Sequence, residues 1–262
     1  MEHAELAELL QWYEAVGADE AIGDAAQSRL RVPEKTLPKS TVLPLAQGRK
    51  AEKDEPAPVM GAIEAMKEAA ALAAAANNVT ELRVAAENFN GLALKRTATQ
   101  IVFADGSADA RIMVIGDAPG TDEDRAGVPF AGANGQLLDK MLGAIGLTRT
   151  ENVYIATILN WRTPGNRAPT KEEIDISLPF IRRHIELVNP AVIVPVGGAA
   201  AKILLESKEP LARLRGKWLD YKGTPAAVLY HPEYLLQSPT QKKAAWEDLQ
   251  MIQAKLKELG AL

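Results

Sequence analysis

Short apolar segments alternate with longer helical segments from near residue 110 onward. Four segments rich in Val, Ile, Leu and Ala have the character of strands, at 110–116, 153–159, 191–197 and 226–231. Helical segments lie between and after them, near 134–146, 171–188, 199–206 and 239–259. This alternation is typical of a parallel sheet with helices on both faces. The sequence therefore predicts an α/β fold.

The start of the chain has a different composition. Apolar side chains recur at helical spacing within an acidic frame over residues 3–16, which predicts a short amphipathic helix within an N-terminal region at 1–32. Residues 33–58 contain five prolines, mixed charge and few large apolar side chains. That composition is typical of a flexible linker.

We expect the folded domain to occupy residues 59–262. It begins with the alanine-rich stretch "MGAIEAMKEAAALAAAANN" at 60–78, which predicts a helix. The following segment "VTELRVAAENF" predicts a second helix at 79–89. Thr80 is the residue that we expect to cap its N-terminus.

Composition limits the possible chemistry. The sequence has no cysteine and three histidines, so disulfides and thiolate metal sites are excluded and a histidine-built metal site is disfavoured. No apolar run reaches the roughly 18 residues of a membrane helix, and the first residues lack a signal-peptide pattern. We therefore expect a cytoplasmic protein with no membrane partner, no metal and no cofactor.

The net charge of −4 is weak evidence against a nucleic-acid partner, because the charge is unevenly distributed. Residues 1–24 contain seven acidic and no basic side chains, whereas residues 202–243 contain eight Lys or Arg against four acids. A local phosphate-binding surface is compatible with this distribution.

Chemically unusual residues follow the predicted strands. Asp117 follows the first strand, Gly197 and Gly198 follow the third, and His231 ends the fourth. In open parallel sheets, ligands bind beyond the carboxyl ends of the strands. The sequence therefore predicts a site at that edge.

Four segments carry a family resemblance: "GDAPGTDEDRAGVPFAGANGQLLDKML", "NVYIATILNWRTPGNRAPTKEE", "VIVPVGGAAAKILL" with "LARLRGKW", and "YHPEYLLQSPTQKKAAWEDL". Together, over roughly residues 82–255, the chain resembles the uracil-DNA glycosylase superfamily, in particular the family 4 branch that usually holds an iron–sulfur cluster. The resemblance implies a three-layer α/β/α fold around a four-stranded parallel sheet. It also implies hydrolysis of the bond between uracil and deoxyribose in DNA, which leaves an abasic site.

The resemblance implies three catalytic residues. Asp117 stands where the family commonly has Glu, and a carboxylate there either positions the attacking water or stabilises positive charge on the sugar. His231 in "HPEYLL" corresponds to the histidine that donates a hydrogen bond to the uracil carbonyl oxygen as it gains charge. Asn166 in "PGNR" corresponds to an asparagine beside the scissile bond.

The resemblance also implies a base pocket. Phe130 corresponds to the aromatic that stacks on the flipped base, and Glu123 to the acid that crowds the thymine methyl group. Thr157 falls where the family usually has Asn, so one hydroxyl replaces an amide. We expect backbone amides near Gly116 and Ala118 to help to read uracil and to keep the pocket specific for it. Asn160 is expected to face the opposite side of its strand.

For DNA, the resemblance implies a wedge that fills the space left by the flipped base, and a set of phosphate contacts. The candidate wedge residues are Leu235, Leu236 and Gln237, and either leucine could equally be a core residue. The residues expected at phosphates are Gly197, Gly198, Arg213, Arg215 and Lys217. The expected partner is uracil-containing DNA, bound by a monomer.

The sequence departs from the family at the four cluster cysteines. These should fall near Phe89, Leu92, Trp161 and Ser177, and none of these residues is a cysteine. We expect the first three to fill the volume of the cluster as an apolar plug.

Two other functions stay open at this point. A relative that binds uracil or damaged bases in DNA without excising them is motivated by Asp117 and Thr157, the two changes in the pocket. A nucleotide-binding enzyme of the Rossmann type is disfavoured, since no predicted strand is followed by a Gly-x-Gly-x-x-Gly motif.

Overall fold

The structure is a computed structural model, and it describes residues 61–261. The predicted helix at 3–16 and the predicted linker at 33–58 lie outside the described residues and stay predictions. Within the described residues, no helix is both long enough and apolar enough to cross a membrane.

A six-stranded sheet with the order β1-β3-β2-β4-β6-β5 forms the centre of the fold. The strands are β1 (Ala104–Gly106), β2 (Ile112–Gly116), β3 (Val153–Thr157), β4 (Val192–Pro195), β5 (Leu219–Tyr221) and β6 (Thr224–Ala226). The inner strands β3, β2, β4 and β6 are parallel, whereas β1 and β5 are antiparallel to their neighbours. The predicted α/β class is confirmed.

The predicted number of four strands was too low. The edge strands β1, with the sequence ADG, and β5, with LDY, are three residues long and contain charged side chains. Such segments carry no apolar run that would mark them as strands. The last predicted strand, 226–231, is also shifted, because β6 ends at Ala226 and only one further bridge joins Val196 to Leu229.

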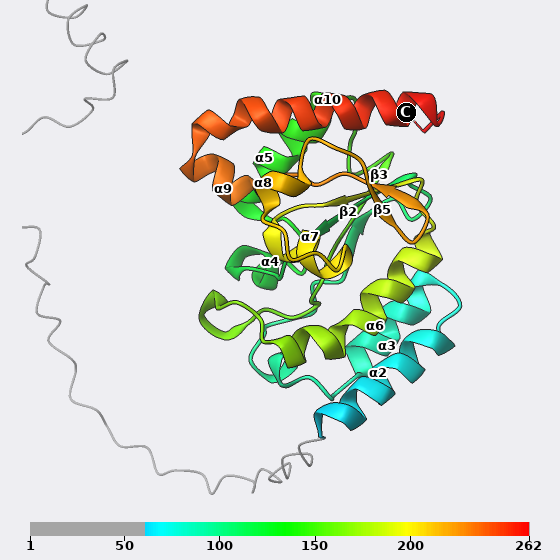
Figure 1. The fold of residues 1–262 in the computed structure, drawn as a ribbon. Helices are drawn as coiled ribbons and strands as arrows, with labels where there is room; N and C mark the ends of the chain where they lie inside the picture. The colour runs from blue at the N-terminus through cyan, green and yellow to red at the C-terminus, as the bar shows by residue number, and fades with distance from the viewer. Residues whose placement is uncertain (1–60, 262) are drawn as a thin grey trace, which may run out of the picture. The chain divides into compact units, whose positions relative to one another are not determined.

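The strands β2, β3 and β4 are buried along their whole length, and alternate side chains enter two different cores. Met113 and Ile115 of β2 belong to one core, and Ile112 and Val114 to the other. Figure 1 shows helices on both faces of the sheet, as in a three-layer α/β/α arrangement. This burial on both faces explains why the strands are continuous apolar runs.

Helices cover both faces of the sheet in the described part of the chain. Buried residues of α2 (Ala62–Ala75), α3 (Val79–Asn88) and α6 (Lys171–Val188) belong to the first core. Those of α5 (Gly132–Gly143), α9 (Pro232–Gln237) and α10 (Lys242–Glu258) belong to the second. In Figure 1 the first group lies below the sheet, and α5 and α10 lie above it.

The two helices predicted at 60–78 and 79–89 correspond to α2 and α3, but the predicted cap of the second is wrong. Asn78, rather than Thr80, is the N-cap of α3, and its side chain accepts a hydrogen bond from the Glu81 backbone N–H at 2.8 Å. Asn and Thr are both good N-caps. The helix begins two residues before the position that Thr80 would have required.

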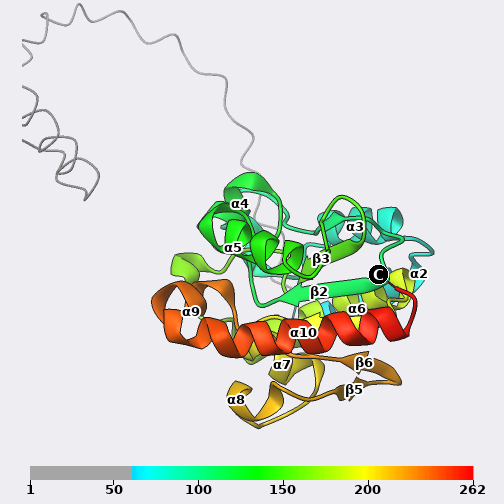
Figure 2. The ribbon, with the colours of Figure 1, turned by 90° about the horizontal axis from the view of Figure 1, so that it is seen from above.

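Short helices are attached around the sheet, and several lie at its carboxyl edge. They are η1 (Ala93–Arg96), α4 (Thr121–Ala126), η2 (Pro164–Asn166), α7 (Gly198–Leu204), α8 (Leu211–Leu214) and η3 (Pro239–Gln241). Figure 2 shows α7 and α8 with the β5–β6 hairpin on one side of the fold, and α4 and α5 on the other. The segments that follow β2, β3 and β4 therefore meet at one edge.

Candidate active site

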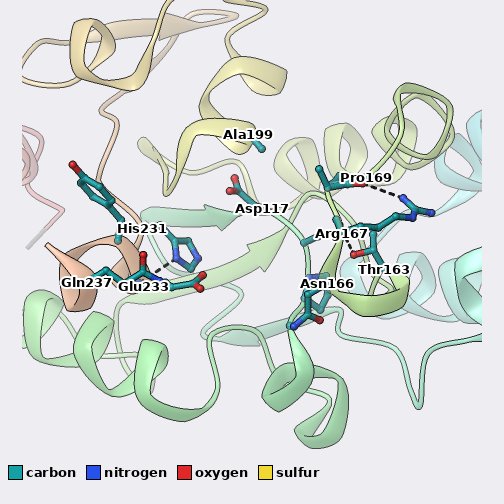
Figure 3. Close-up of a pocket in the computed structure, with 14 residues that line it drawn as sticks. Asp117, Thr163, Asn166, Arg167, Pro169, Ala199, His231, Glu233 and Gln237 are labelled. Carbon is teal, nitrogen blue, oxygen red and sulfur yellow. Dashed lines mark hydrogen bonds between the residues drawn. The ribbon is translucent and has the colours of Figure 1, made fainter.

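A cavity of about 470 Å³ opens beyond the carboxyl ends of the parallel strands. Asp117, Asn166, Arg167, His231, Tyr234 and Gln237 are among the residues that line it. Figure 3 shows Asp117, which follows β2, and His231, at the start of α9, facing this space, with Asn166 at the end of η2. The cavity thus brings together the three catalytic residues predicted from the sequence.

Asp117 is held by the N-terminus of α7. Its Oδ1 accepts a hydrogen bond from the Ala200 backbone N–H at 2.5 Å. Gly197 has a φ of 102°, and a Cβ there would lie 2.7 Å from Asp117 Oδ2, so a side chain at this position would crowd the carboxylate. Burial raises the pKa of Asp117, while the hydrogen bond from Ala200 and the neighbouring His231 act in the opposite direction.

His231 is the N-cap of α9, and this fixes its imidazole. Nδ1 accepts a hydrogen bond from the Glu233 backbone N–H at 3.3 Å, as the dashed line in Figure 3 marks. When one ring nitrogen of a neutral histidine accepts, the other carries the proton. The neutral ring therefore has its N–H at Nε2, as a hydrogen-bond donor requires.

Phe130 is buried and lies against the strand end. A Cβ on Gly116 would lie 2.6 Å from the Phe130 ring, so the absence of a side chain on Gly116 makes room for the ring. The centroids of the Phe130 and His231 rings are 5.5 Å apart. Phe130 is not among the residues that line the open cavity.

Thr157 is buried, and it pairs in register with Gly116 of the neighbouring strand. Its hydroxyl donates a hydrogen bond to the Leu159 backbone carbonyl at 2.7 Å. A hydroxyl has one proton, so Oγ1 has only its lone pairs left for a further partner. Thr157 in this conformation is an acceptor.

Two other predicted site residues use their polar groups within the chain. Glu123 accepts a hydrogen bond from the backbone N–H of Gly120, the N-cap of α4, at 3.0 Å. Its side chain does not line the cavity. Asn166 does line it, and its Oδ1 accepts from Arg162 Nε at 2.6 Å, which fixes the orientation of the amide.

The predicted wedge is corrected at one residue. Leu235 is only 1% exposed and belongs to the core between the sheet and α10, so it is a packing residue. Leu236 is 45% exposed, and the neighbouring Gln237 is also exposed and lines the cavity. The helical turn of α9 separates these neighbours, because successive side chains of a helix point in different directions.

The predicted phosphate contacts are corrected at two residues. Arg215 forms an ion pair with the buried Asp248 at 2.8 Å and lies over the Tyr230 ring, so its guanidinium is engaged inside the protein. The Gly197 backbone N–H donates to the Leu229 carbonyl and is therefore not available to a phosphate. Sequence alone gave no sign of either partner.

Two of the remaining phosphate candidates carry exposed side chains. Lys217 is exposed, and Arg213 is exposed although it pairs with Glu209 at 3.0 Å. An exposed pair of this kind contributes little to stability and can exchange partners. The third remaining candidate, Gly198, is the first residue of α7.

Several residues of this region were not predicted from the sequence. Tyr234 lines the cavity and packs on Tyr230 with ring centroids 5.1 Å apart. Asp124 of α4 is buried. Its carboxylate accepts hydrogen bonds from the Thr99 backbone N–H and from the Thr99 hydroxyl, each at 2.8 Å. Asp124 lies within a run of acids, so its burial has no distinct signal in the sequence.

The four positions that correspond to cluster cysteines lie together. Phe89, Leu92, Trp161 and Ser177 are all buried, and they line one cavity of about 10 Å³. The Phe89 ring packs on Phe180 with centroids 5.5 Å apart. These side chains offer no thiolate, so they do not fit an iron–sulfur cluster. Asn160 also lines this small cavity and not the large one. Because β3 ends at Thr157, strand alternation does not determine the direction of Asn160.

Away from the cavity, the side chains of Tyr154 and His184 form a polar pair that is buried in the core. The Tyr154 hydroxyl and His184 Nε2 are 2.7 Å apart, and the His184 ring stacks on Phe103 at 4.5 Å. Burial lowers the pKa of His184 to about 3 and raises that of Tyr154. Across residues 61–261, no group of three or more His, Cys, Asp or Glu side chains could hold a metal ion.

The fold and the cavity define an α/β protein with a carboxylate and an imidazole at the carboxyl edge of its sheet. The model of the uracil DNA glycosylase superfamily matches residues 103–250. The chain belongs to this superfamily, which confirms the family resemblance and the enzyme class, a uracil-DNA glycosylase, predicted from the sequence.

Similar proteins agree with the family match. The type-4 uracil-DNA glycosylase of Thermotoga maritima is 34% identical over 166 residues, which cover 62% of this chain and 86% of that protein. The enzyme of the same name from Archaeoglobus fulgidus is 36% identical over 167 residues, 61% of this chain and 83% of that protein. A DNA polymerase of Bacillus phage SP01 is 30% identical over 159 residues, 61% of this chain but 17% of the polymerase.

Proposed function

We propose that this protein removes uracil from DNA by hydrolysing the bond between the base and deoxyribose, and that it does so without a metal. The observation that carries the proposal is that Asp117 and His231 line the same cavity, each held by a backbone N–H. The names of the similar type-4 enzymes support the choice of uracil in DNA as substrate.

In the proposed reaction, His231 stabilises the leaving base. As the bond breaks, negative charge develops on the uracil ring, and Nε2–H donates to the carbonyl oxygen on which it gathers. Glu233 holds the imidazole from the other side, so the donor does not have to reorient during the reaction. A preorganised donor of this kind contributes most when water is excluded from the site.

The Asp117 carboxylate serves the sugar side of the same bond. The sugar becomes electron-poor as the base leaves, and a fixed negative charge stabilises it or orients the attacking water. Aspartate is one methylene shorter than the glutamate usual in the family. The Ala200 N–H fixes its Oδ1, which limits the motion of this shorter side chain.

Base selection depends on Thr157. Since its proton is donated to Leu159, its oxygen can accept from the N3–H of uracil but cannot donate to the unprotonated N3 of cytosine. This geometry favours uracil over cytosine. We infer that Phe130 and His231 limit the pocket to a pyrimidine, so that uracil is also preferred to hypoxanthine.

For the DNA, we propose that Leu236 and Gln237 fill the space left by the flipped base, and that Lys217 and Arg213 contact phosphates. Base flipping costs a few kcal/mol of stacking and pairing, which an inserted side chain partly offsets. We further propose that the enzyme acts as a monomer in the cytoplasm.

The experiment is single-turnover release of free base from matched oligonucleotides that carry uracil, cytosine, hypoxanthine or thymine. We expect release of uracil alone by the wild type. Asp117→Asn and His231→Gln should each reduce the rate on the order of 100-fold. Asp220→Asn, in the β5–β6 hairpin, is the control and should keep the wild-type rate.

Base selection is tested with Thr157→Val, which keeps the shape of the side chain and removes the oxygen. We expect this variant to release uracil more slowly and to release no other base. Faster release of hypoxanthine than of uracil by the wild type would contradict the proposed specificity. Tight binding of uracil-containing DNA without any release of base would favour the alternative, a non-catalytic DNA-binding protein.

A further inference from the structure

We propose that Arg149 is a positioning residue that fixes the ring of Phe130 for stacking on the base. This inference deepens the proposed function and rests on it. Arg149 lies in the turn before β3, away from the motifs that carry the family resemblance, and it does not line the cavity. Its effect would pass through the backbone of the loop that carries Phe130.

Arg149 binds two consecutive carbonyl groups of that loop. Its two terminal nitrogens donate to the Pro129 oxygen at 2.8 Å and to the Phe130 oxygen at 2.7 Å. Its Nε donates to Asp139 of α5 at 2.6 Å, and one terminal nitrogen also contacts Asp105 of β1 at 3.2 Å. All three nitrogens of the guanidinium group are therefore engaged, and the side chain is largely buried.

The loop needs such a partner because Phe130 has an uncommon backbone conformation. Its φ is 51°, in the left-handed region that a bulky side chain rarely adopts. A residue in that region persists only where surrounding contacts hold it. The Phe130 carbonyl is pressed against α5, since a Cβ on Gly135 would overlap its oxygen. Arg149 donates a hydrogen bond to this carbonyl.

The backbone at Phe130 determines where its ring lies. The ring fits over Gly116 and lies with its centroid 5.5 Å from that of His231. A different φ at Phe130 would move the ring relative to both residues. Arg149 thereby sets the distance between the stacking surface and the imidazole that donates to the base.

A planar guanidinium can bind two carbonyls and two carboxylates in fixed directions, whereas a lysine ammonium is a single point. Arg149→Lys keeps the positive charge near Asp139 and Asp105 but loses the fixed pair of bonds to the loop. We expect the single-turnover rate of uracil release to fall about tenfold or more, because small displacements of positioned groups have effects of that order.

Arg183 provides a matched control. It donates two hydrogen bonds to the Ala76 carbonyl, at 3.1 Å from Nε and 2.8 Å from a terminal nitrogen, between α6 and the end of α2. Arg183→Lys therefore breaks a similar arginine–carbonyl contact far from the cavity. Its rate should stay at the wild-type value.

A double-mutant cycle separates positioning from a general loss of structure. Once Phe130 is replaced by Ala, no ring remains to be positioned, so adding Arg149→Lys should cause little further loss of rate. Equal tenfold losses in the wild-type and Phe130→Ala backgrounds would overturn the proposal. So would a wild-type rate for Arg149→Lys.

Histidine NMR gives a readout that does not depend on activity. The chain has three histidines, so the ring signals of His231 can be assigned by substitution, and the Phe130 ring lies close enough to shift them. Arg149→Lys should move the His231 signals toward their position in Phe130→Ala and leave those of His184 unchanged. Unmoved His231 signals would overturn the proposal even if the wild type released no uracil.

Gly135→Ala displaces the same carbonyl while keeping the Arg149 side chain, although its Cβ would also lie 3.2 Å from a terminal nitrogen of Arg149. It covers the case in which Arg149→Lys does not fold. Its Cβ would overlap the Phe130 oxygen, so the His231 signals should shift in the same way. A folded Gly135→Ala variant with wild-type signals and a wild-type rate would show that the loop carbonyl does not control the ring.

Discussion

The Ala200 backbone N–H donates a hydrogen bond to the carboxylate of Asp117 at 2.5 Å, across 83 residues of sequence. It joins the turn after β2 to the first turn of α7, and thus places a carboxylate at the carboxyl edge of the sheet. Burial nevertheless raises the pKa of Asp117, so the charged form is held at a cost in stability.

Asp117→Asn should therefore stabilise the fold at neutral pH. A carboxyl group whose folded pKa is raised contributes stability below its unfolded pKa, about 3.9, and loses it as the pH rises through the folded value. The difference in free energy of unfolding in favour of Asp117→Asn should grow as the pH rises from about 4 to 7. Urea denaturation at several pH values measures it, and an advantage that is largest at pH 4 would contradict the assigned shift.

The same shift predicts the acid limb of activity. If catalysis needs the Asp117 carboxylate, the single-turnover rate should fall on acidification at a pH above the ordinary range of an aspartate, because burial raises its pKa. A pH profile of the wild type measures this. A rate that stays constant down to the ordinary pKa of aspartate would show that the ionised form is not required.

His184 should make the fold sensitive to acid. Burial lowers its pKa to about 3, so the unfolded chain binds a proton that the folded chain excludes. Stability is then present above the unfolded pKa of about 6.5 and is lost as the pH falls toward the folded value. The loss should reach about 2 kcal/mol by pH 5, at roughly 1.4 kcal/mol for each pH unit.

His184→Gln keeps a polar partner for the Tyr154 hydroxyl and removes the titrating ring. It should lower stability at pH 7 but flatten its dependence on pH between 7 and 5. The denaturation midpoints of the wild type and of His184→Gln at the two pH values measure this difference. An equally steep pH dependence in the variant would assign the acid sensitivity to other groups.

Trp161 should stabilise the domain as a packing residue. It is 7% exposed in the small cavity where the resemblance places a cluster ligand. Trp161→Ala should cost about 3–5 kcal/mol in the free energy of unfolding, as for other large buried side chains. Trp246, which is 42% exposed, provides the control, and Trp246→Ala should cost far less. Equal losses in the two variants would contradict the role assigned to Trp161.

The leucine pair of α9 should divide into two roles. Leu236→Ala should slow uracil release from double-stranded DNA more than from single-stranded DNA, because only a duplex leaves a gap for a wedge to fill. Leu235→Ala should instead cost about 2–5 kcal/mol of stability as a buried leucine. An unchanged rate on duplex DNA in Leu236→Ala would remove Leu236 from the proposed wedge.

Much of the central sheet could be predicted, because β2, β3 and β4 are buried on both faces and their sequences are continuous apolar runs. The edge strands β1 and β5 could not, because pairing with a neighbour rather than an apolar pattern defines them. The positions of Asp117 and His231 after predicted strands indicated the edge at which they lie, since residues that follow parallel strands meet there.

The directions of individual side chains were less predictable. Neighbouring leucines in α9 have the same propensity, yet Leu235 is buried and Leu236 is exposed. The partner of Arg215 is Asp248, which is 33 residues away, and that of Thr157 is a backbone carbonyl. Such pairings depend on the tertiary fold, so motif and spacing do not indicate them.

We propose that this superfamily member excises uracil with Asp117 and His231 and needs no iron–sulfur cluster. Iron content and uracil release should be measured on the same chelator-treated preparation, with alkali to reveal abasic sites in the oligonucleotide. We predict a molar amount of iron far below that of the protein, together with full uracil release by the wild type. Asp117→Asn and His231→Gln should lose this release. Release that depends on added iron, or that persists in both variants, would contradict the account.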